Sequence, residues 1–406
     1  MKIIEGSITS PTGFLALGCF IGIKKAKKDL TLISSQKPAR TSAVFTKNLV
    51  KAPPLLWCEK IIDAKTLVNG IVINSGNANA CTGSTGYEHA QLTAETFAQC
   101  LGVNPESILV TSTGVIGQFL PIEKITQGIK NNYQNLSSTV ESANDAATGI
   151  LTTDTFTKQI AVEIQIGGKA VKIGGISKGS GMIHPNMATM LAFITTDINI
   201  SQELLDKAFK ATIEDTYNMI SVDGDTSTND MVVALANGMA ENELVESENA
   251  DYEIFKNALN YVNEYLAKQI IKDGEGATKF IEVAIEGASS KASAKKLAMS
   301  IITSSLVKTA FFGQDANWGR ILAAMGYAGV EFNQDKVSIN FKSNAGEIAV
   351  FENGAPMSFD EAKALEILKE KEITVCVKMN DGDGSTRAWG CDLSYDYVKI
   401  NAEYRT

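Results

Sequence analysis

The chain has 406 residues, of which 44% are apolar and 20% are charged. This composition is typical of a globular protein large enough for two or three packed units, and it excludes a disordered or fibrous chain. The net charge is −9, and there is no basic arm and no interleaving of aromatic and basic residues, so nucleic acid is not expected as a partner.

Cysteine and histidine are few and scattered. The six cysteines form no C-x-x-C pair, which in a chain of this length indicates reduced thiols inside the cell. Only His89 and His184 are present, and neither has a potential metal ligand at a useful spacing. We therefore expect no metal site and no Ser-His-Asp triad.

An apolar stretch at residues 13–23 is too short to cross a bilayer. The lysines that flank it, residues 24–28, lie on the wrong side for a signal peptide. We expect it to form one or two buried strands, and the protein to be cytoplasmic with no membrane contact.

The first half of the chain alternates short apolar runs with helical patterns. A strand is predicted at residues 71–73, followed by a polar loop at 74–79 and a helix from about 88 to 101 that ends at Gly102. A second strand at 108–110 runs into a predicted strand-to-helix turn at 112–117, after which Pro121 opens another helix.

A hairpin is predicted next, with strands at 159–166 and 170–173 joined by Gly167 and Gly168. It leads into a segment rich in Gly, Pro and Asn that ends at Thr189, and residues 190–194 then read as a fully buried strand. Thr189 is therefore expected where a loop meets a rigid core strand.

The second half adds a helix capped by Ser201, a longer helix from about 252 to 272, and strands at 337–339, 348–350 and 373–377. Helices and short strands alternate throughout. The prediction is a mixed α/β protein in which layered sheets are covered by helices.

Two glycine-containing patterns carry no site in this interpretation. The Asp-Gly-Asp sequences at 223–225 and 381–383 lack the Glu that completes a calcium-binding loop, so tight turns are expected there. Residues 175–181 are glycine-rich but lack the Gly-Lys-Ser/Thr end of a phosphate-binding loop.

Thr189 offers one chemical route that needs no histidine. A threonine hydroxyl requires a neighbouring base, and the α-amine of an N-terminal threonine, with a reference pKa of about 7.7–8.0, can serve as that base. The amine becomes free only if the peptide after Ala188 is cut, and the Thr189 hydroxyl can make this cut by attacking the Ala188 carbonyl. An ordinary strand-edge threonine is the commoner case, so the residue by itself does not decide between the two.

The string around Thr189 resembles the self-cleavage signature of the bifunctional ornithine acetyltransferase/N-acetylglutamate synthase family of arginine biosynthesis. Matching segments run through nearly the whole chain, at residues 13–14, 22–25, 44–46, 74–81, 112–117, 152–155, 178–193, 223–230, 315–320 and 397–406. So many ordered matches make a chance resemblance untenable.

The resemblance implies a role for each matching site residue. Thr189 corresponds to the nucleophile, with cleavage between Ala188 and Thr189, and Thr113 and Gly114 correspond to the oxyanion hole. Lys178 would meet an α-carboxylate and Glu275 an ammonium group of ornithine. The substrate-binding set as a whole is Thr155, Lys178, Thr189, Glu275, Asn401 and Thr406.

The resemblance also implies the architecture and the reaction. The fold would be a layered αββα sandwich cut into fragments 1–188 and 189–406, the second including a smaller α/β region from about 290, assembled as α2β2. An acetyl group would pass from N-acetylornithine to Thr189 and then to glutamate without metal or organic cofactor, and acetyl-CoA would be a second donor in bifunctional members.

Two other functions remain open at this point. One is an N-terminal-nucleophile amidase or aminopeptidase, in which water is the acceptor in place of glutamate. The other is a non-catalytic amino-acid-binding protein that never cuts itself. Product analysis with and without glutamate separates the first from the transferase, and a Thr189→Ala variant with full biological activity would favour the second.

Overall fold

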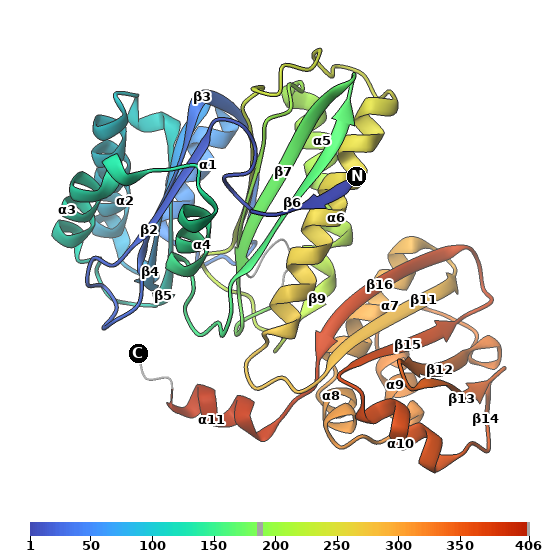
Figure 1. The fold of residues 1–406 in the computed structure, drawn as a ribbon. Helices are drawn as coiled ribbons and strands as arrows, with labels where there is room; N and C mark the ends of the chain where they lie inside the picture. Colours follow the sequence, from blue (N-terminus) through green and yellow to red (C-terminus); the bar gives the residue numbers. More distant parts are fainter. Residues whose placement is uncertain (185–189, 404–406) are drawn as a thin grey trace.

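The computed structural model describes residues 1–184 and 190–403, and it contains two units (Figure 1). The larger unit has two stacked layers of strands with helices on both outer sides. The smaller unit follows it in the chain and is built around a second sheet. Ala188, Thr189 and Thr406 lie outside the described residues.

The first layer of the larger unit contains β2 (Phe14–Cys19), β3 (Leu30–Phe45), β4 (Val68–Asn77) and β5 (Ile108–Val115). The second contains β1 (Lys2–Ile4), β6 (Lys158–Ile166), β7 (Lys169–Lys178), β8 (Leu191–Thr196) and β10 (Met231–Ala236). The long strand β3 belongs to both layers. Its first half pairs with β2 and β4, and its second half pairs with β10, so the strand order is continuous: β1-β6-β7-β8-β10-β3-β4-β5.

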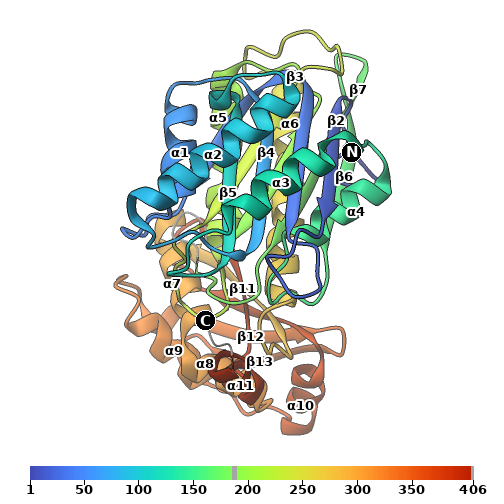
Figure 2. The ribbon, with the colours of Figure 1, turned by 90° about the vertical axis from the view of Figure 1, so that its left-hand side faces the viewer.

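Helices cover the two outer faces. On the first layer lie α1 (Pro53–Asp63), α2 (Gly83–Leu101) and α3 (Ile122–Asn132), as Figure 2 shows, and α4 (Val140–Gly149) packs against β2. On the second layer lie α5 (Gln202–Asp215) and α6 (Ala250–Lys272). The resulting order is helices, strands, strands, helices, which is the αββα arrangement.

The central strands β8 and β10 are buried on both faces, as expected of strands that separate two apolar layers. Alternate side chains point in opposite directions. Leu191, Phe193 and Val233 pack against the first layer, whereas Ile194 and Val232 pack with the apolar sides of α5 and α6. Because β8 and β10 are buried on both faces, they hold the residues at their ends in fixed positions.

The smaller unit is a sheet with the order β14-β13-β12-β15-β11-β16-β9. Its strands are β9 (Ile220–Ser221), β11 (Phe280–Ala288), β12 (Ser338–Ser343), β13 (Gly346–Glu352), β14 (Ala355–Pro356), β15 (Glu372–Lys378) and β16 (Gly384–Cys391). Its helices are α7 (Lys291–Thr303), α8 (Ser305–Phe312), α9 (Trp318–Gly326) and α10 (Glu361–Lys369).

Helix α11 (Tyr395–Glu403) leaves the smaller unit and runs beneath the larger one (Figure 1). None of its residues is buried, so packing of an apolar face does not fix its position. Two polar contacts connect it to the larger unit instead. Tyr397 Oη lies 3.3 Å from Asp223 Oδ2, and Asn401 Nδ2 donates to Glu275 Oε2 over 2.9 Å.

Several sequence predictions are confirmed. Gly102 ends α2 in a left-handed conformation, Ser201 caps α5 through its hydroxyl, and the hairpin β6–β7 turns at Gly167 and Gly168. Residues 13–23 contain β2, and among the described residues no helix is long and apolar enough to cross a membrane.

Two predictions around the site are wrong. The loop expected at 74–79 is strand as far as Asn77, and Thr113 and Gly114 lie within β5 rather than in a strand-to-helix turn. The reason is the same in both cases. The polar ends of β4 and β5 pair with each other, Ser75 with Thr113 and Gly76 with Gly114, and this pairing cannot be read from either segment alone.

Candidate active site

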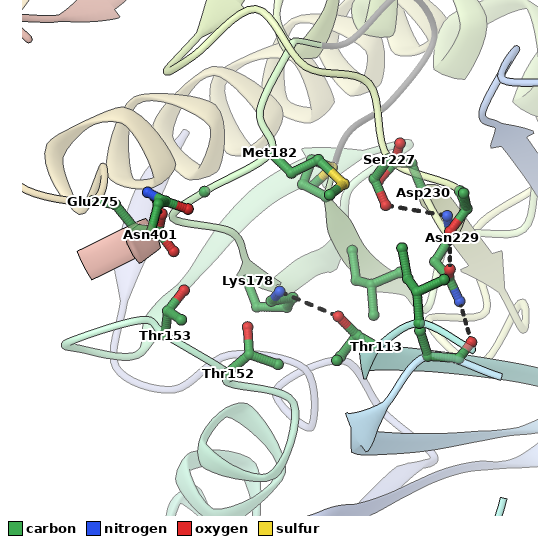
Figure 3. Close-up of a pocket in the computed structure, with 17 residues that line it drawn as sticks. Thr113, Thr152, Thr153, Lys178, Met182, Ser227, Asn229, Asp230, Glu275 and Asn401 are labelled. Carbon is green, nitrogen blue, oxygen red and sulfur yellow. Dashed lines mark hydrogen bonds between the residues drawn. The ribbon is translucent and has the colours of Figure 1, made fainter. Parts of the chain in front are cut away.

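A cavity of about 160 Å³ opens where the ends of β5, β7, β8 and β10 meet the end of α6 and helix α11. It brings together five of the predicted site residues, which come from positions as far apart as 113 and 401: Thr113, Gly114, Lys178, Glu275 and Asn401 (Figure 3). The other lining residues are Ala78, Ile116, Thr152, Thr153, Gly181, Met182, Met190, Leu191, Ser227, Thr228, Asn229 and Asp230.

The end of β5 has a backbone that only glycine tolerates. Gly114 has φ +133°, and a Cβ on it would lie 2.4 Å from the carbonyl carbon of Gly76. β4 and β5 therefore approach more closely here than side chains would permit. The close approach fixes the backbone at Thr113 and Gly114, where the resemblance requires an oxyanion hole.

Asn229 holds this strand end in place from the other layer. Its Nδ2 donates to the carbonyl of Ala78 over 2.6 Å and to that of Ser112 over 2.9 Å, and its Oδ1 accepts from Thr228 Oγ1. A buried amide that satisfies two carbonyls in two segments acts as a fixed spacer between them. No local pattern predicts a role for this residue, although it lies within the matching segment 223–230.

Lys178, the last residue of β7, is only 8% exposed. Its Nζ donates to Thr113 Oγ1 over 3.3 Å (Figure 3). Among the described residues no carboxylate forms an ion pair with this ammonium group. Burial and, to a smaller extent, the charge of Lys158 lower the pKa of Lys178, and the charges of Asp154 and Glu275 oppose that effect. The side chain is therefore a buried cationic group that lines the cavity, compensated by the nearby Asp154 but in direct ion pair with no carboxylate of the described residues.

A buried cluster of Asp154, Lys158 and Asp273 lies beside Lys178. Lys158 Nζ is 2.7 Å from Asp154 Oδ1 and 2.5 Å from Asp273 Oδ2, and all three side chains are at most 2% exposed. Burial alone would raise the pKa of Asp154, but the ammonium groups of Lys178 and Lys158 hold it well below its usual range. Asp154 is thus an ionised carboxylate in the protein interior.

This cluster connects three segments that line the cavity. Asp154 accepts hydrogen bonds from the backbone N–H groups of Thr152 and Gly179, at 3.0 and 2.7 Å. The carbonyl of Asp273, at the end of α6, accepts from Ser180 Oγ over 2.5 Å. The positions of Thr152, of the chain after Lys178 and of the chain before Glu275 are therefore coupled through one lysine.

Thr155 does not line the cavity. Its hydroxyl and its backbone N–H both donate to Asp273, so the side chain is committed to the buried cluster. Thr152 and Thr153 line the cavity in its place (Figure 3). All three threonines stand in one short string, and spacing alone cannot tell which of them faces inward.

Glu275 and Asn401 form the side of the cavity nearest α11. The Glu275 carboxylate is half-buried and accepts from Asn401 Nδ2. A Cβ on Gly181 would lie 2.3 Å from Glu275 Oε2, so the chain at 181 passes directly against this carboxylate. The arrangement places one anionic group opposite the cationic Lys178 wall.

The residues on either side of the predicted cleavage point are firmly anchored. Asp223 accepts from the N–H groups of Met182 and Ile183, at 2.6 and 2.9 Å, and Val222 N–H donates to Ile183 O. After the gap, Met190 O accepts from Met231 N–H, and Met190 and Leu191 line the cavity. The cleavage point at Ala188 and Thr189 lies outside the described residues, between these two anchors.

His184 has surroundings that suit a loop-shaping residue. Its Nδ1 is 3.2 Å from Ser221 Oγ, and its carbonyl accepts from Thr226 Oγ1. Burial lowers its pKa, against the opposite effect of Asp223 and Asp225. Within residues 1–184 and 190–403, no group of three or more His, Cys, Asp or Glu residues is arranged to bind a metal ion.

Comparison with known proteins matches almost the entire chain. The sequence profile of the ArgJ family matches residues 15–406. The arginine biosynthesis bifunctional protein ArgJ of Caldanaerobacter subterraneus is 53% identical over 410 residues, covering 100% of both chains. The protein of the same name from Bacillus subtilis is 46% identical over 403 residues, covering 99% of this chain and 97% of that one.

A solved structure agrees with the fold. The crystal structure of the arginine biosynthesis bifunctional protein from Bacillus halodurans has 48% sequence identity and a TM-score of 0.51. It covers 53% of this chain and 100% of that chain. The matching part of the fold therefore resembles an arrangement determined by experiment.

Proposed function

Because this chain belongs to the ArgJ family, we propose that its cavity is the site of a glutamate N-acetyltransferase of arginine biosynthesis. The acetyl group moves from N2-acetylornithine to glutamate. The observation that supports this most strongly is the convergence of Thr113, Gly114, Lys178, Glu275 and Asn401 on one cavity next to Met190. Cationic and anionic groups on different walls suit a substrate that carries both a carboxylate and an ammonium group.

We propose Thr189 as the nucleophile, made N-terminal by cleavage after Ala188. Its α-amine takes the hydroxyl proton as the oxygen attacks the acetyl carbonyl carbon. The oxyanion that forms is stabilised by the Thr113 hydroxyl and the Gly114 N–H, donors worth about 2.7–4 kcal/mol each in comparable sites. The C–N bond of the amide then breaks, the leaving amine takes the proton, and acetyl-Thr189 remains.

The second half of the cycle reverses these steps with glutamate. Its neutral amine attacks the ester carbonyl carbon, and the same donors stabilise the oxyanion. The proton that this nitrogen loses passes through the Thr189 α-amine to the Thr189 oxygen as the C–O bond breaks. Lys178 holds the α-carboxylate of either amino acid, Glu275 with Asn401 holds the ornithine ammonium group, and Thr406 completes the binding set. No step needs a metal or organic cofactor, so a chelator should leave the rate unchanged.

The relatives named above are called bifunctional. We therefore include acetyl-CoA as a second donor that loads the same threonine. We further propose that fragments 1–188 and 189–406 stay together, assemble as α2β2 and work in the cytoplasm. Size-exclusion chromatography with light scattering tests the assembly.

Denaturing intact-mass spectrometry before and after addition of N-acetylornithine tests the central proposal. Two fragments that meet at Ala188/Thr189, with one acetyl group on the fragment that begins at Thr189, are expected. Product analysis with glutamate should then give N-acetylglutamate. Free acetate in its place would indicate a hydrolase, and an uncut chain that gains no acetyl group would indicate a binding protein.

A further inference from the structure

Asp230 is a carboxyl group in the cavity that the proposed reaction does not use. It precedes β10, is 2% exposed, and lines the cavity together with Lys178 (Figure 3). The pairing of β10 with β8 sets Met231 opposite Leu191, so Asp230 stands next to Met190 at the ends of these strands. Its backbone carbonyl accepts from Thr46 N–H, which holds the residue in place at the start of β10.

One oxygen of this carboxyl group has no partner among the described residues. Oδ2 of Asp230 is buried and makes no hydrogen bond to them, and none of their lysines or arginines forms an ion pair with the group. An ionised carboxylate in this situation would lack both solvation and a counter-ion. Burial raises the pKa of Asp230 well above its usual value, against the weaker opposing effects of Ser227, Lys178 and Thr46.

Lys178 is a buried cation that likewise has no ion-pair partner among the described residues. Its ammonium group is buried in the same cavity. Among the described residues it donates to the Thr113 hydroxyl and has no carboxylate within ion-pair distance. A cationic donor and an acid with one unpartnered oxygen therefore line one cavity. A ligand carboxylate can accept a hydrogen bond from each of them and remove both deficits at once.

We propose that Asp230 is a neutral carboxylic acid that donates a hydrogen bond, beside Lys178, to the carboxylate of the bound amino acid. This deepens the function proposed above and rests on it. An ionised Asp230 would neutralise Lys178 and repel an anionic substrate. If Asp230 is neutral, Lys178 remains free to form an ion pair with the substrate carboxylate. The protonated Asp230 then adds a second hydrogen-bond donor, which favours a carboxylate over an uncharged group.

Infrared difference spectroscopy on the processed enzyme tests the protonation state directly. Glutamate alone, without an acetyl donor, is the probe, because it binds without reacting. We expect the addition of glutamate to shift a band in the region of protonated carboxylic acids, and we expect that band to move when the aspartates are labelled with carbon-13. The absence of any aspartate-derived band that responds to glutamate would overturn the proposal without any variant.

Three variants assign the band and its role. Asp230→Asn, a neutral donor of similar shape, should lose the band but keep KM for glutamate within about threefold, whereas Asp230→Ala should raise KM by about three- to tenfold, the range of one hydrogen bond. Asp225→Asn, an exposed acid in the same segment, should change neither. An equal loss of affinity in Asp230→Asn and Asp230→Ala would show that a charge is required and would refute the neutral acid.

The acetyl-transfer assay on the unaltered enzyme separates this inference from the proposed function. If no acetyl group reaches glutamate although glutamate still shifts the aspartate band, the proposed reaction fails and the assignment of Asp230 stands. If transfer occurs and the band is missing, only the assignment of Asp230 fails.

Discussion

Replacement of Lys158 by methionine should destabilise the protein far more than the loss of an ordinary ion pair. Lys158 neutralises Asp154 and Asp273, and all three side chains are almost completely buried. Methionine preserves most of the volume and the apolar stem but removes the ammonium group. Two carboxylates would then remain in the protein interior with fewer compensating charges.

The size of the effect follows from this burial. Removal of one partner of a buried ion pair costs about 3–5 kcal/mol, because the charge left behind is not solvated. For a chain of 406 residues, an unfolding entropy of about 2.1 cal/mol/K per residue converts this loss into a fall of about 4–6 °C in Tm.

The matched control is Lys207→Met. Lys207 Nζ lies 2.5 Å from Glu248 Oε1, the same distance as that between Lys158 and Asp273, but the two side chains are 54% and 50% exposed. Because solvent screens an exposed ion pair, this variant should have the same Tm as the unaltered protein.

Calorimetry of both variants in one buffer gives the fall in Tm for a buried and for an exposed ion pair that have the same N–O distance. A separate acetyl-transfer assay should show a lower rate for Lys158→Met, since Thr152 and Gly179 lose their fixed acceptor when Asp154 moves. Equal melting temperatures for the two lysine variants would refute the reasoning. They would mean that the cluster is solvated or contributes nothing.

Three further predictions concern the cavity. Gly114→Ala should lower kcat by about 10²- to 10³-fold, the value of one oxyanion donor, because its Cβ would collide with the backbone. The control Gly117→Ala, at φ +84° with open space around it, should change stability only. Equal kcat values for the two variants would contradict the prediction. Asn229→Ala leaves two buried carbonyls without their donor and should cost about 1–3 kcal/mol of stability in denaturant unfolding, and an unchanged midpoint would argue against its role as a spacer. Because folding lowers the pKa of Asp154, the ionised carboxylate stabilises the protein above its unfolded pKa, and this stabilisation is lost as the pH falls toward the folded pKa. Asp154→Asn should therefore flatten the acid side of a plot of Tm against pH. Parallel plots for the variant and the unaltered protein would count against this prediction.

Local patterns in the sequence predicted those elements whose signals are local. The cap at Ser201, the left-handed Gly102 and the Gly167–Gly168 turn each depend on a few adjacent residues, and each is where it was expected. The layered fold and the site residues came from the resemblance to a family. Periodicity alone would have produced only a mixed α/β protein.

The remaining features depend on contacts between distant segments. β3 has polar residues at its centre, Ser34 to Thr41, because it passes from one layer to the other, and no short pattern predicts a strand with that role. The buried cluster joins residues 154 and 158 to residue 273, more than a hundred positions further along the chain. The same applies to Thr155, which stays a prediction as a substrate contact. It bonds to Asp273 while Thr152 lines the cavity, and the position of Asp273 cannot be read from the string of threonines.

The strand order has a consequence for how the protein must be made. β8 and β10, which follow the predicted cut, lie between β7 and β3, which precede it. Neither fragment alone contains the complete sheet of the larger unit, because fragment 1–188 would present two open edges where β8 and β10 belong. If the chain is cut as proposed, it must therefore fold before it is divided, and we expect fragments synthesised separately to aggregate rather than reassemble. The proposed cut would release a chain end without releasing a subunit, so a single gene would deliver two interlocked polypeptides in a fixed one-to-one ratio.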